Sequence, residues 1–441
     1  MNSQLRIMND ELKIKIVPEL RFPEFQNDED WDIKPLKKVF SIFQGYAFSS
    51  KDSVEKGTRW LKIADVSIQK MNHNNPSFLP DDYINIYKSF LIKKGDYVLA
   101  LTRPILNGKL KISTVDEILH NSLLNQRVGK LVSNENLSLV YYLLQTHYLI
   151  NEIEKSIAGS EPPNLSMKQI EDIAIPLPSN PTEQQKIANC LSSLDNLITA
   201  ETEKLDHLKD HKKGLLQQLF PAKGETKPQF RFPEFENDGD WEEKRLSDFD
   251  DLISGDGDWI LSENITENGE YKIIQLSSTG FGVFLEKKLK TISKDTFIKL
   301  KGTPILKGDL LINRMVDSKK INNCIFPLEG KYVTSVDVCW IRENAFFNNY
   351  FFMNLLCTNN NQIKLLSLSS GAGRVRISKK NLFERFTFLL PKDPKEQQKI
   401  ADCLSSVDDL IEVQTTKIKA LKKHKKGLMQ QLFPNVNDSA V

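Results

Sequence analysis

The 441-residue sequence predicts an α+β protein, in which a long antiparallel coiled-coil pair of helices separates two mixed α/β domains related by a pseudo-twofold internal repeat. Three observations lead to this fold class. Segments of the chain recur in the same order, two of the recurring segments carry a heptad pattern of aliphatic residues, and the stretches between them hold short β-like runs.

The internal repeat is the clearest of these signals. RFPEFQNDEDW (21–31) returns as RFPEFENDGDW (231–241), EQQKIANCLSSLD (183–195) as EQQKIADCLSSVD (396–408), and HKKGLLQQLFP (211–221) as HKKGLMQQLFP (424–434). The last two pairs are both offset by 213 residues, whereas the stretches between the repeated segments differ. Two copies are too few for a solenoid, so the repeat indicates two modules that do the same job twice.

Each copy of the second and third segments predicts one long helix. Aliphatic residues step by three and four positions, which is the spacing of a coiled-coil seam. The predicted seam is Ile187, Leu191, Leu194, Ile198, Leu205 and Leu208 in the first copy, and Ile400, Leu404, Val407, Ile411, Ile418 and Leu421 in the second. Each seam could instead pack on its own domain, but a helix of roughly 55 Å, at 1.5 Å per residue, favours pairing of the two helices.

The direction of the helix pair follows from charge and from the linker. A parallel pair in register would place Lys212 beside Lys425 in the seam, and an antiparallel pair separates these like charges. The linker PAKGETKPQF (221–230) is short and contains two prolines, so it suits a second module that begins where the first helix ends. Both observations predict antiparallel helices.

The variable regions before the two helices predict mixed α/β structure. Short β-like runs, broken by Gly, Pro, Asn and Asp, include WLKIADVSI (60–68), YVLALT (97–102), YKIIQLS (271–277) and KYVTSVDVCWI (331–341).

Charge is unevenly distributed, although 60 Lys+Arg against 58 Asp+Glu leave a net charge of only +2. Residues 287–320 hold ten basic and three acidic residues, 371–381 hold four basic residues and no acid, and 93–111 hold five basic residues and one acid. One such run is typical of a solvated face. Basic runs in both modules, mixed with Gly, Asn, Ser and Thr, favour contact with the phosphates of a nucleic acid.

Nine residues in these basic stretches are candidate DNA contacts, because Arg and Lys bind phosphate or guanine and Asn reads adenine. They are Arg103, Asn107, Lys109 and Lys111 in the first module, and Arg314, Lys319, Lys320, Arg374 and Arg376 in the second. Arg374 and Arg376 are the strongest candidates, because they follow a Gly-Ala-Gly stretch that permits close approach of the backbone.

Catalytic, metal and membrane signatures are missing from the sequence. No glycine-rich stretch completes a dinucleotide-binding or P-loop motif, and no nucleophile has a recognisable partner, so no catalytic residue is predicted. His207 and His211 have zinc-ligand spacing but lie on a predicted coiled-coil helix beside acidic residues, so we predict a solvated face and no metal site. Five scattered cysteines and an acidic N-terminal stretch predict a reduced, cytoplasmic protein, and no apolar run is long enough to span a membrane.

The combination of motifs resembles the specificity (S) subunit of a type I restriction–modification enzyme. The doubled EQQKIA and HKKGL segments carry the resemblance, and WLKIADV, KKGDYVLALTR and GSEPPNLSMKQIEDIAIPLP are similar in order to that family. Their counterparts in the second module are YKIIQLS, LKGDLLINR and GAGRVRISKKNLFERFTFLLP.

The resemblance implies two target-recognition domains that each read one half of a bipartite, gapped double-stranded DNA target. The implied segments are an N-terminal arm (1–17), domain 1 (18–180), conserved helix 1 (181–220), a linker (221–230), domain 2 (231–393), conserved helix 2 (394–434) and a C-terminal tail (435–441). It also implies partner methyltransferase (M) subunits and motor-endonuclease (R) subunits, which would hold S-adenosylmethionine, ATP and Mg and direct adenine methylation or restriction. This chain would hold no cofactor.

Two other functions remain open from the sequence. One is a stand-alone DNA-binding regulator on the same duplicated scaffold, and the other is a coiled-coil adaptor with no nucleic-acid role.

Overall fold

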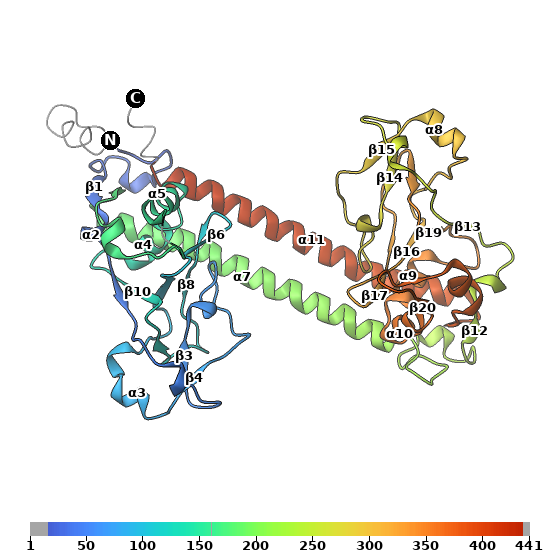
Figure 1. Cartoon of the computed structure of the whole chain (residues 1–441), viewed down its shortest axis with the longest axis horizontal. Coiled ribbons are helices and arrows are strands. Elements are labelled where there is room, and N and C mark those ends of the chain that lie inside the picture. The colour runs from blue at the N-terminus through green and yellow to red at the C-terminus, as the bar shows by residue number, and fades with distance from the viewer. Residues whose placement is uncertain (1–15, 160, 435–441) are drawn as a thin grey trace. The chain divides into compact units, whose positions relative to one another are not determined.

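The computed structural model describes residues 16–159 and 161–434, and the chain divides into two compact units (Figure 1). Unit 1 comprises residues 1–202 and 417–441, and unit 2 comprises residues 203–416. Each unit therefore contains one variable region, the beginning of one long helix and the end of the other. The segments predicted from the sequence keep each long helix whole, whereas the boundary between the two compact units falls within each long helix.

Unit 1 is built on small antiparallel and mixed sheets. Its strands are β1 (Asp32–Pro35), β2 (Ser41–Gln44), β3 (Thr58–Leu61), β4 (Phe78–Leu79), β5 (Tyr97–Ala100), β6 (Ile105–Leu106), β7 (Lys109–Leu110), β8 (Ile112–Thr114), β9 (Leu123–Leu124), β10 (Val128–Val132) and β11 (Ala174–Leu177). They form a four-stranded antiparallel sheet in the order β2-β10-β5-β8, a three-stranded sheet β4-β3-β9, and the pairs β1-β11 and β6-β7.

The helices of unit 1 cover the core of the four-stranded sheet. They are α2 (Leu36–Val39), α3 (Tyr83–Ile86), α4 (Leu137–Leu143), α5 (His147–Ile157), α6 (Met167–Ile170) and the first part of α7 (Pro181–Gln218). Asn136 and Thr146 begin α4 and α5, because each side chain accepts a hydrogen bond from the backbone N–H three residues on. One apolar core joins residues of β5, α4 and α5 to Ile187 and Leu191 of α7.

Unit 2 repeats this plan with a larger central sheet. Its strands are β12 (Glu242–Lys244), β13 (Ser254–Gly255), β14 (Tyr271–Ile274), β15 (Lys290–Ile292), β16 (Leu310–Asp317), β17 (Lys320–Ile325), β18 (Tyr332–Thr334), β19 (Val338–Ile341), β20 (Ser369–Ser370), β21 (Arg376–Ile377) and β22 (Phe388–Leu390). The central sheet has the order β13-β19-β16-β21-β20, with β17 also paired to β16. The sheet β15-β14-β18 and the pair β12-β22 complete the unit.

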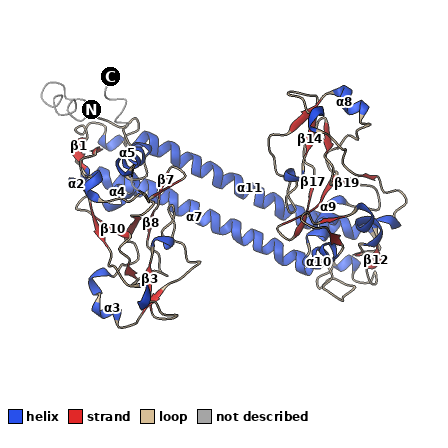
Figure 2. Cartoon of the chain, in the orientation of Figure 1, coloured by secondary structure: helices blue, strands red, loops and turns tan. Residues whose placement is uncertain are grey.

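The helices of unit 2 are α8 (Lys294–Lys299), α9 (Asn349–Cys357), α10 (Asn359–Ser367), the last part of α7 and the first part of α11 (Pro394–Leu432). A phenylalanine-rich core that includes Phe351, Phe352 and Phe388 joins the sheet to Ile400 and Leu404 of α11. Figure 2 shows that short strands and loops surround these helices, so the mixed α/β character predicted for both variable regions is confirmed.

Within each unit, the two long helices run antiparallel. In unit 1 the side chain of Lys425 on α11 binds Asp195 on α7 at 2.6 Å, and Tyr142 donates a hydrogen bond to the same carboxylate at 2.8 Å. In unit 2 Lys212 binds Asp408 at 2.7 Å, and Tyr350 donates to that carboxylate. Each seam lysine therefore pairs with an aspartate that also accepts from a tyrosine, which explains why Lys425 tolerates burial and Lys212 half-burial. All twelve predicted seam residues are buried or half-buried.

The last residues of each long helix are part of a unit's core. Leu432 and Phe433 are buried in the core of unit 1, whereas Leu219 and Phe220 are buried in the core of unit 2. The repeated LFP ending therefore marks an apolar anchor, and the following proline stops the helix.

The repeated RFPEF segment is also an anchor. Arg21 makes a bidentate pair with Glu183 in the first turn of α7, with both N–O distances at 2.8 Å, and the Trp31 indole donates to the same carboxylate at 3.3 Å. The second copy repeats these bonds between Arg231, Trp241 and Glu396 of α11. Both copies thus fix the beginning of a long helix to its own variable region.

Across the described ranges, 16–159 and 161–434, no helix is both long and apolar enough to cross a membrane.

Candidate nucleic-acid interface

A β-hairpin in unit 1 exposes two of the candidate DNA contacts. β6 and β7 are joined by Asn107 and Gly108, whose φ values of 51° and 66° are those of a two-residue type I′ turn. Asn and Gly are the residues that adopt this left-handed backbone most readily, so the Asn-Gly pair places the turn here. Asn107 and Lys109 are consequently exposed at the hairpin tip.

Unit 2 has a hairpin with the same kind of turn. β16 and β17 are joined by Ser318 and Lys319, whose φ values are 49° and 63°. Lys319 is exposed at the tip, and the amine of the neighbouring Lys320 lies 4.3 Å from the ring centre of Phe281. Both modules therefore place cations on a projecting turn.

A second polar site lies beside each hairpin. It lies where one strand stops pairing with one neighbouring segment and begins to pair with another. In unit 1 the residue after β5, Leu101, donates its N–H to the carbonyl of Arg127 at 2.9 Å and accepts from the N–H of Leu165 at 2.7 Å. The hydroxyl of Thr102 donates to the side-chain carbonyl of Asn164 at 2.7 Å. We call this site junction 1 and define it by Thr102, Arg103, Lys111, Arg127 and Asn164.

Three cations of junction 1 surround one open pocket of about 380 Å³. Arg103, Lys111 and Arg127 line it together with Thr102, Ile63, Ala64 and Pro162. Burial lowers the pKa of Lys111, and the positive charge of Arg103 lowers it further. Three positive charges face one open space, and Glu161 makes a long, exposed ion pair with Arg103 at 4.0 Å. This arrangement suits an electron-rich group of DNA, such as a phosphate or the O6/N7 edge of guanine.

Unit 2 has the equivalent junction at the same backbone position. The N–H of Arg314, after the first residues of β16, donates to the carbonyl of Asp337 at 2.8 Å, and Met315 pairs with Arg376 of β21. Val316 donates to Val375 at 3.0 Å, as Arg103 donates to Pro163 at 2.7 Å in unit 1. We call this site junction 2 and define it by Asp256, Arg314, Met315, Asp337 and Arg376.

The charged side chains of junction 2 form a chain of ion pairs. Oδ1 of Asp337 forms an ion pair with Arg314 at 3.1 Å and accepts a hydrogen bond from Arg376 at 3.0 Å, and Arg314 also donates to Asp256 at 2.9 Å. The Arg314 side chain is 7% exposed, whereas that of Arg376 is 54% exposed. The Arg376 side chain is therefore half exposed to solvent, while one of its terminal nitrogens donates to Asp337.

Arg314 is one of the predicted DNA contacts, and its guanidinium is buried between the carboxylates of Asp256 and Asp337. This placement favours a role within the protein over a direct contact with DNA. The reason is its position on β16, where the equivalent residue of unit 1 is the buried Leu101. The number of basic residues in a segment does not show whether an arginine on this strand points into the core or toward solvent.

The remaining candidate, Arg374, lies in the loop before β21. This loop contains Gly371 and Gly373, with φ of 139° and 90°, and a Cβ on Gly371 would lie 2.3 Å from the carbonyl oxygen of Arg374. Glycine is therefore required for the loop to fold back, and Arg374 is exposed as a result.

Comparison with known protein families identifies the type of protein. The model of the type I restriction modification DNA specificity domain matches the chain twice, at residues 28–210 and 238–423. The chain belongs to this family of DNA specificity domains. The resemblance seen in the sequence is thereby confirmed, and the two matches coincide with the two modules. The prediction of a specificity subunit that is not itself an enzyme agrees with this membership.

Individual members of the family give the same result. The chain is 36% identical over 198 residues to the type I restriction enzyme MjaVIII specificity subunit of Methanocaldococcus jannaschii, a match to 44% of this chain and 46% of the relative. This match thus spans about half the length of that relative. A 26% identical match joins 92% of this chain to 93% of the putative MjaX specificity subunit of the same organism.

A solved structure shows the fold of the whole chain. The crystal structure of the type I restriction–modification system S subunit from M. genitalium aligns with a TM-score of 0.60 at 16% identity, over 96% of this chain and 100% of that chain. The predicted fold class is confirmed.

Within this specificity-domain chain, reasoning from sequence missed six of the ten residues that define the two junctions. They are Thr102, Arg127, Asn164, Asp256, Met315 and Asp337. Arg127 and Asn164 stand outside the basic runs, and Asp337 is acidic, so a search for clustered positive charge passes over all of them. The fold shows their equivalence, because Arg127 and Asp337 each come directly before an equivalent strand, β10 and β19, although the sequence around them is not repeated.

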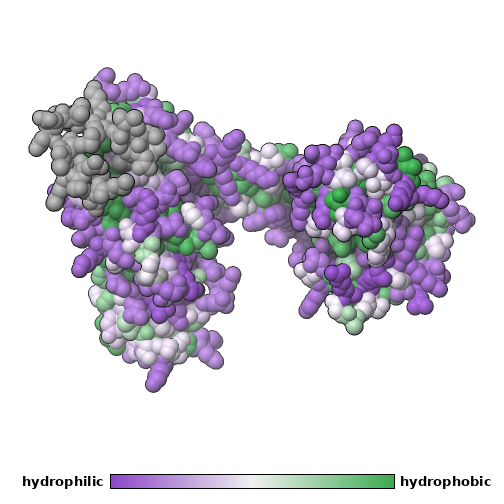
Figure 3. Space-filling view, turned by 45° about the horizontal axis from the view of Figure 1, so that its top comes forward, coloured by the Kyte–Doolittle hydropathy of each residue, from purple (hydrophilic) through white to green (hydrophobic). Residues whose placement is uncertain are grey.

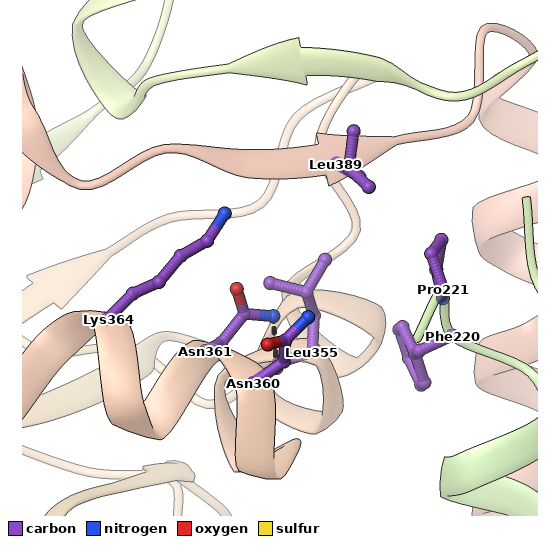
Figure 4. A pocket seen from close by; sticks show the side chains of 7 residues that line it. All are labelled: Phe220, Pro221, Leu355, Asn360, Asn361, Lys364 and Leu389. Carbon is purple, nitrogen blue, oxygen red and sulfur yellow. Dashed lines mark hydrogen bonds between the residues drawn. The ribbon is translucent and has the colours of Figure 1, made fainter. Parts of the chain in front are cut away.

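Two further surface features of the specificity-domain chain do not form part of this interface. In unit 1, the ring of Tyr46 packs at a tilt against the rings of Phe48, Tyr87 and Phe90. Figure 3 shows that pale and green residues gather at the lower end of the unit drawn on the left. In unit 2, a pocket beside Phe220 is lined by Leu355, Asn361, Lys364 and Leu389 (Figure 4). Its volume of about 20 Å³ has room for one water molecule, so this pocket is a packing defect rather than a ligand site.

Proposed function

We propose that this chain is the DNA-reading subunit of a type I restriction–modification complex. Each module would recognise one half of a bipartite, gapped double-stranded DNA target through its hairpin tip and its junction. The observation that carries the proposal is the double match of the DNA specificity domain, because each match includes one such pair of features.

Phosphate contacts and base contacts would be divided between these features. Cations on a projecting turn, such as Lys109 and Lys319, suit the phosphate backbone, which supplies most of the affinity. Side chains that are held by neighbours, such as Asn164 and Arg376, suit base edges, because base reading requires a fixed geometry.

The chemistry would belong to partner subunits in the cytoplasm. Methyltransferase subunits would bind S-adenosylmethionine and modify an adenine, and motor-endonuclease subunits would use ATP and Mg for restriction. Asp195, Asp337 and Asp408 each bind a lysine or an arginine in a helix or junction contact, which favours a structural role for these three carboxylates.

The decisive experiment is to co-express the chain with its methyltransferase subunit and to map modified adenines across the host genome. We expect one bipartite motif with a gap of unspecified bases. A short palindrome, or no motif, would contradict the proposal. Tight binding of a specific site by the chain alone would instead support a stand-alone regulator, and salt-insensitive association without DNA would support an adaptor.

A further inference from the structure

We propose that the two junctions set the base specificity of the two modules, and that Arg376 of junction 2 reads a guanine while Asp337 holds it in place. This inference rests on the proposed DNA recognition and adds the residue, the base and the positioning group. Three observations support it.

The first observation is that the junctions share a backbone but not their side chains. The backbone pairing places Thr102 of unit 1 at the position of Met315 in unit 2, and Asn164 at the position of Arg376. Arg127 likewise stands at the position of Asp337, because each carbonyl accepts from the residue before the paired position. By contrast, the Arg–Glu–Trp anchors at the two helix starts use identical residues in both modules. A shared backbone that carries different side chains would allow the two modules to recognise different bases.

The second observation is the geometry of Arg376. Its side chain is half exposed, and one terminal nitrogen donates to Asp337 at 3.0 Å. A guanidinium has five N–H donors in a rigid plane, so the remaining donors stay available on the exposed side. A paired, planar donor group of this kind matches O6 and N7 of guanine in the major groove.

The third observation is that Asp337 is itself held by several contacts. Its carboxylate binds the buried Arg314, its carbonyl accepts the Arg314 N–H at 2.8 Å, and its φ of 69° places it in a turn that Asp tolerates. Arg314 is fixed in turn by Asp256 at 2.9 Å. Arg314 and Asp337 are therefore positioning residues, which act on DNA only through Arg376.

The same geometry distinguishes Arg376 from its neighbour Arg374. The carboxylate of Asp337 offsets much of the charge of Arg376, which makes Arg376 poor at attracting phosphate but leaves its hydrogen-bonding pattern intact. Arg374 has no acidic partner within 16–159 and 161–434, so it retains its full charge for a phosphate. Substitutions of these two arginines, which lie two positions apart, should therefore have different effects on DNA recognition.

The test uses the complex of the full chain with its methyltransferase subunit and a DNA library randomised across the mapped target. For the unsubstituted chain we expect one position in one half-site to require guanine. Arg376→Ala and Arg376→Lys should each reduce the preference for guanine at that position about tenfold to a hundredfold, because Lys keeps the charge but lacks the planar pair of donors. Asp337→Asn should reduce the same preference less, with Arg376 still present.

Two matched variants complete the experiment. Arg374→Ala should lower methylation of all library members by a similar factor without changing base preference. Arg127→Ala should change only the other half-site. Thermal unfolding of each variant shows whether it is folded, and the half-site that a variant does not contact serves as an internal reference.

The outcomes separate the two proposals. If the unsubstituted complex shows no gapped motif, the proposed function fails. If a gapped motif is present but Arg376→Ala leaves every base preference within twofold of the unsubstituted chain, or changes both halves, only the present inference fails. If Asp337→Asn unfolds the chain, Arg376→Lys still decides the question, since it leaves the buried ion pairs of Arg314 intact.

Discussion

Buried carboxylates organise both modules at the level of single residues. Glu183 and Glu396 each receive a bidentate arginine and an indole N–H at the start of a long helix. The positive end of the helix dipole adds to this stabilisation, since both glutamates lie in the first turn. The sequence shows that RFPEF and EQQKIA are repeated, but only the fold shows that the two segments bind each other.

We expect Glu183→Gln to destabilise the chain by about 3 kcal/mol, because it leaves the buried guanidinium of Arg21 without a counter-charge. Denaturant unfolding measures this change. Glu24→Gln is the matched control, since Glu24 makes an exposed pair with Lys186 on the same helix, and little change is expected there. Equal effects of the two substitutions would show that burial does not determine the strength of the anchor.

At the level of elements, the hairpin tips combine backbone strain with exposed charge. Asn107 and Gly108 suit their left-handed turn, whereas Ser318 and Lys319 occupy the same conformation at a cost of about 1 to 2 kcal/mol each. A positive charge retained at a strained position indicates that the side chain has a use there.

Glycine substitutions in this turn should therefore separate stability from binding. Ser318→Gly and Lys319→Gly should both raise the melting temperature, because glycine adopts a positive φ without steric cost. Only Lys319→Gly should weaken binding of a DNA duplex that carries the mapped target. Unchanged binding by Lys319→Gly would remove this residue from the interface.

The seam ion pairs give a second prediction at this level. In a double-mutant cycle with Lys425→Met and Asp195→Asn, we expect a coupling energy of about 1 to 3 kcal/mol, because the lysine is 8% exposed and the carboxylate is shared with Tyr142. The exposed pair Lys209 and Asp206 on α7 should show no measurable coupling. Additive effects of Lys425 and Asp195 would contradict the antiparallel pairing within unit 1.

For the whole molecule, a net charge of +2 conceals the part of the chain that would attract DNA. Positive charge is concentrated at the hairpin tips and in junction 1, while many acids are bound to internal partners, as at Glu183 and Asp337. DNA affinity should therefore depend on salt more steeply than the net charge suggests.

We expect the plot of log affinity against log salt concentration to become less steep by about 0.9 for Lys109→Ala, the contribution of one phosphate contact. Binding of the assembled complex to its mapped target, measured between low and physiological salt, provides the slope. Lys419→Ala, which removes an exposed lysine from α11, should leave the slope unchanged. A slope that is insensitive to Lys109 would mean that the unit 1 hairpin does not contact the backbone.

The sequence by itself determined the repeat, the two long helices, their antiparallel direction and the specificity-domain family. Local periodicity and repeated motifs are written in consecutive residues, so these features need no knowledge of the fold. Tertiary structure alone decided which charges face outward and which residues meet at the junctions. Arg314 and Arg376 are both basic residues on strands, yet one is buried at the position of Leu101 and the other is half exposed. Asp337 joins them across 39 residues of sequence, and no local pattern encodes a contact over that separation.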